Sequence, residues 1–236
     1  MTRRKSPAAA IIALLALAAA VGAGCACFAA GGAAPLSHER LIELRALVEA
    51  AAAGGGEEAL EDEEYGGALV AEGKVPASLF REAERVLALL PDGLMGEFRA
   101  RGWAIVLTST RDLSAYVPGG GRIVGATVFD EKRIYIEADV AVVAESLLHE
   151  MGHFADMSLG WPSGGEAFLG AFEDERAAYA EADERGAGSA REAFAAVFND
   201  ICLERGCRER LAPRMFGAVR EEMSRLAVQT ACQLDG

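Results

Sequence analysis

The apolar residues between positions 140 and 157 recur every three or four residues. They are Val140, Val143, Leu147, Leu148, Met151 and Phe154. This is the spacing of one face of an α-helix, and Asp139 and Gly160 stand where an N-cap and a C-terminal glycine belong. We therefore expect a helix over residues 140–157 whose apolar face packs into a core.

Shorter apolar runs ahead of this helix predict strands. They cover residues 103–108, 123–129 and 133–136, and the last two form a hairpin that leads directly into the helix. Further helices are predicted over residues 75–90, 94–101, 166–184, 189–204 and 212–233. The pattern predicts an α+β fold, with a small sheet whose last strand leads into helix 140–157 and a mainly helical C-terminal part.

The beginning of the chain has the pattern of a secretory signal. Basic residues at positions 3–5 precede an uncharged apolar stretch over residues 8–23, and small residues follow it. Cleavage is expected near Ala26 or Ala30, although the stretch is also long enough for an uncleaved membrane anchor. We therefore assign residues 1–30 to a signal peptide or N-terminal anchor and expect the rest outside the cytoplasm.

The remaining chain divides into two parts. Residues 31–66 predict a short helix over 36–53 and then a solvated linker, because glycines at 54–56 and an acidic run at 57–64 offer little apolar surface. Residues 67–236 have the length of one domain.

Charge and cysteine content restrict the partners. The formal net charge of −13 argues against nucleic acid, because phosphate binding needs a basic surface. In an oxidising compartment we expect one disulfide, between Cys202 or Cys207 and Cys232. The alternative is that all three are small buried residues.

The segment His149-Glu150-Met151-Gly152-His153 carries the candidate chemistry, and it holds two of the three histidines of the chain. On a helix, residues i and i+4 share a face, so both imidazoles can bind one Zn²⁺ ion. Zinc lowers the pKa of a bound water, and Glu150 is placed to act on that water as general base. We therefore expect a zinc-dependent endopeptidase that acts on a protein or peptide substrate.

A catalytic zinc needs a third protein ligand. The remaining histidine, His38, lies in the N-terminal part, and Asp156 and Leu159 occupy the positions where a metzincin has glycine and histidine. The third ligand is therefore expected to be a carboxylate from a following helix, as in gluzincins.

Two carboxylate positions compete for this role. Glu173 lies twenty residues after His153, the offset of thermolysin-like enzymes, with Glu175 close by, but its surroundings are charged. Glu192 begins a helix whose same face carries small residues, which would allow a close approach to the metal helix. Glu192 also fits a capping box with Ser189, in which it would only satisfy a backbone N–H.

A family resemblance favours Glu192. The HEMGH segment with Phe154-Ala155-Asp156, the later Glu192-Ala193-Phe194-Ala195-Ala196-Val197-Phe198, and the preceding hairpin with Gly125 and Thr127 resemble the anthrax lethal-factor-like metallopeptidases, which include secreted Pro-Pro endopeptidases. The resemblance spans roughly residues 103–198. It implies a zincin-like fold in which an edge strand lies beside the HExxH helix and can pair with an extended peptide. It also implies zinc ligands His149, His153 and Glu192, and Glu150 as general base. It also implies a preference for proline near the cut.

One position departs from the family. A tyrosine that stabilises the oxyanion stands there seven residues before the ligand glutamate, and this chain has Arg185. Either Arg185 or the earlier Tyr179 could serve instead. The rival hypothesis is a non-enzymatic zinc-binding module. We do not expect Asp156 to be a ligand, because it follows His153 by only three residues. It is expected either to orient one of the imidazoles by accepting its second N–H or to be a charge at the end of the helix.

Overall fold

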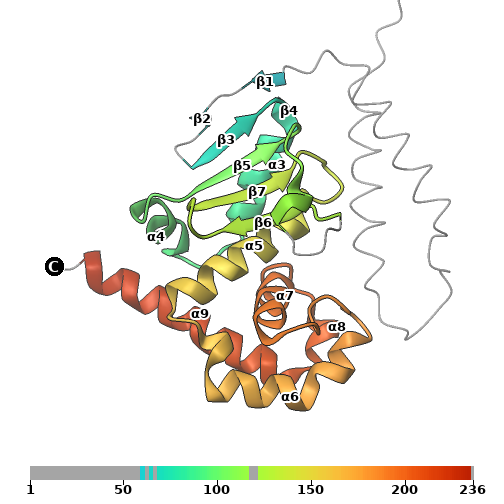
Figure 1. Cartoon of the computed structure of the whole chain (residues 1–236). Helices are drawn as coiled ribbons and strands as arrows, with labels where there is room; N and C mark the ends of the chain where they lie inside the picture. Colours follow the sequence, from blue (N-terminus) through green and yellow to red (C-terminus); the bar gives the residue numbers. More distant parts are fainter. Residues whose placement is uncertain (1–58, 62–63, 66–67, 117–121, 235–236) are drawn as a thin grey trace, which may run out of the picture. The chain divides into compact units, whose positions relative to one another are not determined.

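The structure is a computed structural model that describes residues 59–61, 64–65, 68–116 and 122–234 (Figure 1). The expected signal peptide, its cleavage site and the helix over 36–53 lie outside these residues. Among the described residues, none of the helices has the length and apolar character needed to cross a membrane.

Five strands form the main sheet, in the order β2-β3-β5-β7-β6. Their bounds are β2 Glu64–Tyr65, β3 Leu69–Glu72, β5 Ala104–Thr108, β7 Arg133–Glu137 and β6 Gly125–Val128. The three central strands are parallel, whereas β2 and β6 pair antiparallel with their neighbours. The predicted hairpin is confirmed, and its first strand, β6, is an edge strand.

Two strands lie where the sequence predicts a solvated linker. β1, Ala59–Glu61, pairs with β4, Lys74–Pro76, and β2 pairs with β3. The linker prediction is wrong for these two segments, because strand pairing uses backbone groups that an acidic sequence also offers. Short, charged strands at a sheet edge are common in natural proteins.

Seven α-helices complete the described part of the chain. They are α3 Ala77–Leu87, α4 Leu94–Ala100, α5 Val143–Ser158, α6 Glu166–Ala180, α7 Ala190–Cys202, α8 Gly206–Glu209 and α9 Pro213–Leu234. The helix α5 lies between the sheet and the group formed by α6 to α9 (Figure 1). The architecture is therefore α+β, as the sequence predicts.

The predicted metal helix begins three residues later than expected. Asp139 accepts the backbone N–H of Ala141 and caps a turn ahead of α5, so Val140 lies outside the helix and is 57% exposed. At the other end, Gly160 has the left-handed φ of 82° that the sequence leads us to expect of a terminal glycine. The N–H of Trp161 bonds to Asp156 O at 2.7 Å, which closes the last turn.

Other boundaries differ in similar ways. The helix expected over 75–90 begins only after Pro76, because Val75 belongs to β4. The helix expected over 166–184 ends at Ala180, and the strands β3 and β4 and the short helix α8 are additional. Pro76 ends β4 and directly precedes α3. A proline is tolerated at the start of a helix because its missing N–H would have no partner there.

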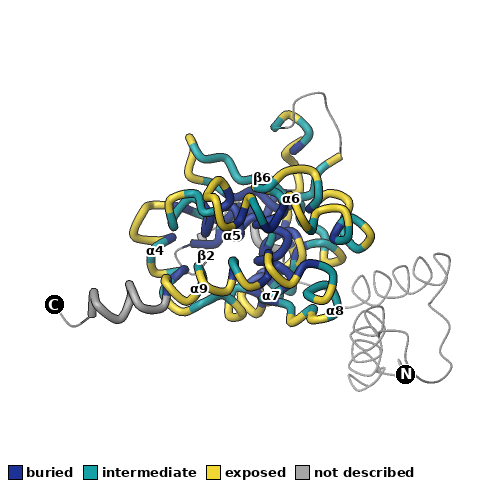
Figure 2. Tube along the Cα trace, turned by 90° about the horizontal axis from the view of Figure 1, so that it is seen from below, coloured by how far each residue is buried: buried dark blue, intermediate teal, exposed yellow. Residues whose placement is uncertain are grey.

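The core lies between the sheet and α5. Alternate residues of β5 and β7 face it, namely Ile105, Leu107, Ile134 and Ile136, and each is fully buried. The expected apolar positions of α5 from Val143 to Phe154 are also fully buried. Figure 2 shows the exposed residues on the outer turns of the helices and the buried ones between them.

Neither of the two cysteines whose side chains the structure describes forms the expected disulfide. Cys202 and Cys207 are both free thiols, and the side chain of Cys232 lies outside the described residues. Cys202 belongs to the buried core, where burial raises the pKa of its thiol to about 12. A buried, protonated thiol of this kind contributes by packing.

Candidate metal centre

The two histidines of α5 meet the first acidic residue of α7. The Nε2 atom of His149 lies 3.2 Å from Glu192 Oε2, and Nε2 of His153 lies 3.5 Å from Glu192 Oε1. The imidazole rings are nearly perpendicular, at 88°, with their centres 4.9 Å apart. These three residues are the only group of three metal-binding side chains found among the described residues.

The spacing of these atoms fits a small divalent cation. Tetrahedral zinc with ligands at about 2.0–2.1 Å separates neighbouring donor atoms by about 3.4 Å. The two nitrogen-to-oxygen distances, 3.2 and 3.5 Å, lie on either side of that value, and all the potential ligand atoms lie within 4.8 Å of one another. Two imidazoles and one carboxylate are also a common ligand set of catalytic zinc.

A glycine allows the two helices to approach each other. A Cβ atom on Gly152 of α5 would lie 2.8 Å from Cα and 3.0 Å from the carbonyl oxygen of Ala195 in α7. Any larger residue would push the helices apart, and Glu192, one turn before Ala195, would move away from the histidines. The close approach expected from the small residues of α7 is therefore present.

Glu150 lies against the edge strand β6. Its Oε2 accepts a hydrogen bond of 2.7 Å from the hydroxyl of Thr127, and a Cβ on Gly125 would come within 3.0 Å of its side chain. Glu150 is 8% exposed. Burial raises its pKa above the ordinary value, while the charge of His149 and the Thr127 hydrogen bond act in the opposite direction. A raised pKa suits a carboxylate that must accept and release a proton.

The three potential ligands are electrostatically coupled. Burial opposes protonation of His149, but the hydrogen bond with Glu192 and the charge of Glu150 outweigh it, so the His149 pKa is raised. The same hydrogen bond lowers the pKa of Glu192. Burial, together with the charge of His149, lowers the pKa of His153 to about 4. Glu192 is thus an anion beside two nitrogen donors, as a cation site requires.

The Glu192 side chain is not used as a helix cap. Ser189 accepts the backbone N–H of Glu192 at 3.2 Å and caps α7 alone, which leaves the carboxylate free to face the histidines. The competing carboxylates lie elsewhere: Glu173 is exposed, and Glu175 accepts the N–H groups of Arg214 and Met215 at the start of α9. The structure therefore brings together Glu192, and neither Glu173 nor Glu175, with the two histidines.

Asp156 does not orient an imidazole, so the first of its two expected roles is wrong. Its two oxygens accept the N–H and the O–H of Ser163 at 2.9 and 2.6 Å, which fixes the turn after α5. The Nδ1 atom of His153 is buried without a hydrogen-bond partner among the described residues. A carboxylate three residues after a histidine can face either the imidazole or the turn that follows the helix, and the sequence does not distinguish these two orientations.

Tyr179 is not brought to the metal centre. It is fully buried, and its hydroxyl donates a 2.7 Å hydrogen bond to Asp200. Arg208 in turn contacts Asp200 at 3.0 Å and Asp183 at 3.3 Å. Tyr179 therefore belongs to a buried network that joins the end of α6 to α7 and α8.

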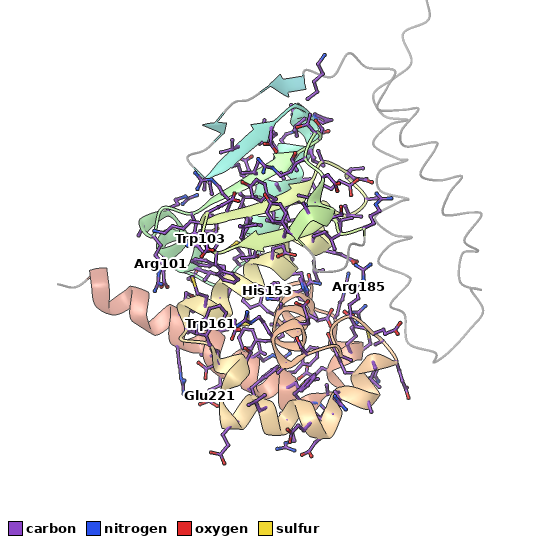
Figure 3. All side chains as sticks on the ribbon, in the orientation of Figure 1. Arg101, Trp103, His153, Trp161, Arg185 and Glu221 are labelled. Carbon is purple, nitrogen blue, oxygen red and sulfur yellow. The ribbon has the colours of Figure 1, made fainter. Side chains whose placement is uncertain are left out.

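Arg185 lies in the exposed loop between α6 and α7. Within the described part of the chain, no carboxylate pairs with its guanidinium. Two residues earlier, Asp183 accepts the N–H of Gly186 at 2.8 Å, and its charge contributes to the raised pKa of His149. The loop thus lies near the metal centre, and Figure 3 shows Arg185 extending from it toward the sheet.

Sequence reasoning missed two side chains next to the candidate site. The sequence indicates Thr127 only through the family resemblance, although a buried glutamate needs a hydrogen-bond donor and a hydroxyl on a neighbouring strand can supply it. Arg191 precedes Glu192, and its guanidinium stacks on the ring of Trp161 at 4.4 Å. No spacing rule along the chain connects Arg191 with Trp161.

Comparison with known proteins supports the fold. No protein-family model matches the sequence, and no curated protein sequence matches it. Among solved structures, the chain is similar to the Pro-Pro endopeptidase PPEP-2 from Paenibacillus alvei, with 17% sequence identity and a TM-score of 0.50. The match covers 66% of this chain and 96% of that endopeptidase. The α+β fold described above is therefore shared with that protein.

Proposed function

We propose that this chain is a zinc-dependent endopeptidase of the gluzincin type. The observation that carries the proposal is the convergence of His149, His153 and Glu192. Glu150 is buried beside this group, on the helix α5 that also carries both histidines. The shared fold with a Pro-Pro endopeptidase supports it. Protein or peptide chains are the proposed substrates.

Each of the four residues has a role that its surroundings explain. His149, His153 and Glu192 would hold the zinc ion, which supplies Lewis acidity for the scissile carbonyl and lowers the pKa of water. Glu150 accepts the proton of the attacking water and passes it to the leaving amine. Thr127 holds the Glu150 carboxylate through one oxygen and leaves the other for this transfer.

The free edge of β6 would bind the substrate. Within the described part of the chain β6 pairs with β7 and with no second strand, and it carries both Gly125 and Thr127 against Glu150. An extended peptide added to this edge through backbone hydrogen bonds would pass the metal centre. Glu192 is only partly buried, with 43% of its side chain exposed, so one side of the centre is open.

Arg185 would stabilise the oxyanion that forms on the scissile carbonyl. It occupies the position of the family tyrosine, and its guanidinium is exposed without a carboxylate partner among the described residues. Tyr179 is committed to Asp200. A permanent cation stabilises a developing negative charge as a tyrosine hydroxyl does.

The deciding experiment compares the parent protein with Glu150→Gln. Both are loaded with zinc and incubated with a diverse peptide library, including proline-rich peptides, and the products are read by mass spectrometry. We expect the parent to cleave, and Glu150→Gln to keep stoichiometric zinc and lose cleavage. Equal cleavage by both proteins would refute the mechanism. Zinc binding without cleavage by the parent would favour the non-enzymatic zinc-binding module.

Export from the cytoplasm is part of the proposal. It is supported by the basic and apolar pattern of residues 1–30. Expression of the full chain with a C-terminal tag, followed by N-terminal sequencing of the exported protein, tests it. Cleavage near Ala26 or Ala30 is expected for a signal peptide, and an intact N-terminus in the membrane fraction for an anchor.

A further inference from the structure

Arg191 is a fixed cation next to the proposed metal centre. Its guanidinium lies over the ring of Trp161 at 4.4 Å, and Trp161 packs against Phe129 with ring centres 5.3 Å apart. Stacking on an indole fixes the plane of a guanidinium while its N–H groups at the rim stay available. The rings therefore hold the cation in place and leave its hydrogen-bond donors unused.

These donors have no acceptor among the described residues. Arg205 and Arg208, which lie in the same group of helices, both contact carboxylates. Arg191, in contrast, makes neither an ion pair nor a side-chain hydrogen bond in the described part of the chain. Arg191 is exposed, so these N–H groups are accessible to a ligand.

The cation lies beside the path proposed for the substrate. Phe129 directly follows the edge strand β6, and Arg191 directly precedes the ligand Glu192. The charge of Arg191 lowers the pKa of His153 and of Glu192, which places it within electrostatic range of both. A peptide lying along β6 past the metal centre would therefore reach Arg191 at the Phe129 end of the strand.

We propose that Arg191, held on Trp161, forms a subsite that selects an acidic side chain of the substrate a few residues from the cleaved bond. A guanidinium binds a carboxylate through two parallel N–H···O bonds, which gives direction as well as charge. The aromatic rings of Trp161 and Phe129 would pack against the aliphatic part of that side chain. The inference rests on the proposed function for the position of the peptide, and binding can test it without cleavage.

The test measures binding to zinc-loaded Glu150→Gln. The probes are decapeptide pools in which one position at a time is fixed as Glu or as Gln, and the readout is tryptophan fluorescence together with calorimetry. We expect tighter binding of Glu peptides than of Gln peptides at one position, by about tenfold, as for a charge-assisted hydrogen bond near the surface. This ratio should fall toward one when Arg191→Gln is added, and at high salt.

Two further variants make the result decisive. Arg191→Lys keeps the charge but not the planar stack, so it should retain only part of the preference. Arg81→Gln removes an equal charge from the exposed face of α3 and should leave the preference intact. Equal binding of Glu and Gln peptides at every position, or an unchanged preference in zinc-loaded Arg191→Gln, would overturn the inference. Acid-selective binding by a protein whose parent form cleaves nothing would uphold it while refuting the proposed peptidase activity.

Discussion

The hydroxyl of Thr127 lies 2.7 Å from Oε2 of Glu150 and joins the edge strand β6 to the helix that carries both histidines. Gly125, two residues earlier on the same strand, leaves room for the glutamate side chain. A buried carboxylate with a single fixed donor has one oxygen held and one oxygen free. This contact links the strand proposed to bind substrate to the group proposed to move its proton.

Replacing Thr127 with valine should slow peptide cleavage by about ten- to a hundredfold, because a hydrogen bond to a charged group is worth about 1.5–3 kcal/mol. The hydrogen bond lowers the pKa of Glu150, so its loss raises that pKa further. Glu150 must be ionised to accept a proton, and the acidic limb of the pH–rate profile should therefore move to higher pH. Thr127→Ser keeps the hydroxyl and should keep the parent profile. A displaced profile in the serine variant would contradict this role.

Replacing Gly152 with alanine should separate α5 from α7. The added Cβ would meet backbone atoms of Ala195, which cannot rotate away, and overpacking of this kind costs about 1–3 kcal/mol. We expect lower stability in chemical denaturation and weaker zinc binding together. Gly170→Ala, in α6, is the matched control, because a Cβ there meets nothing within 4 Å. That variant should be neutral or stabilised by about 0.5–1 kcal/mol.

Much of the candidate site could be predicted because its spacing is local. His149, Glu150 and His153 follow from helical geometry alone, and the small residues of α7 indicate the approach at Ala195. Arg191 on Trp161 and Asp156 on Ser163 could not be predicted. These contacts depend on how a turn folds back on a helix, which the periodicity of the sequence does not specify.

The fold shows the same division. The longer helices repeat a pattern over several turns, and the β6–β7 hairpin joins two apolar runs that are adjacent in the sequence, so both can be predicted even where their ends move by a few residues. β1 and β2 are only three and two residues long and owe their pairing to partners distant along the chain. An acidic sequence at a sheet edge and an acidic linker have the same composition.

Replacing Glu192 with glutamine should abolish tight zinc binding, whereas Glu173→Gln should leave it unchanged. Glu192 faces both Nε2 atoms, and Glu173 is exposed on α6. Changes to residues that only support ligands weaken metal affinity about 10–100-fold, so loss of a direct ligand should exceed about 100-fold. Competition with a zinc chelator measures both variants. Weaker binding in Glu173→Gln alone would favour the thermolysin-like arrangement instead.

Replacing Tyr179 with phenylalanine should affect stability more than catalysis. Its hydroxyl donates to the buried Asp200, and a buried carboxylate short of one donor costs about 1–3 kcal/mol. Arg185→Gln should show the reverse, with a fall in kcat and an unchanged unfolding midpoint, because the side chain is exposed. Steady-state kinetics well below the unfolding temperature separate the two. A kcat loss in Tyr179→Phe equal to that in Arg185→Gln would restore the tyrosine as a candidate.

Zinc should stabilise the protein at about pH 8 and have little effect at about pH 5. The hydrogen bond with Glu192 and the charge of Glu150 outweigh burial and raise the pKa of His149, and zinc binds only the neutral imidazole. Without metal, the protonated His149 pairs with Glu192, so its contribution to stability is present at low pH and is lost as the pH rises through the raised pKa. With zinc present, the pH dependence of stability reverses, because zinc takes the place of the proton between His149 and Glu192.

At about 100 times its dissociation constant, zinc adds about 2.7 kcal/mol to the stability at the higher pH. Thermal unfolding with zinc or with a chelator, at both pH values, measures the difference. An equal zinc effect at both pH values would show that the metal binds elsewhere.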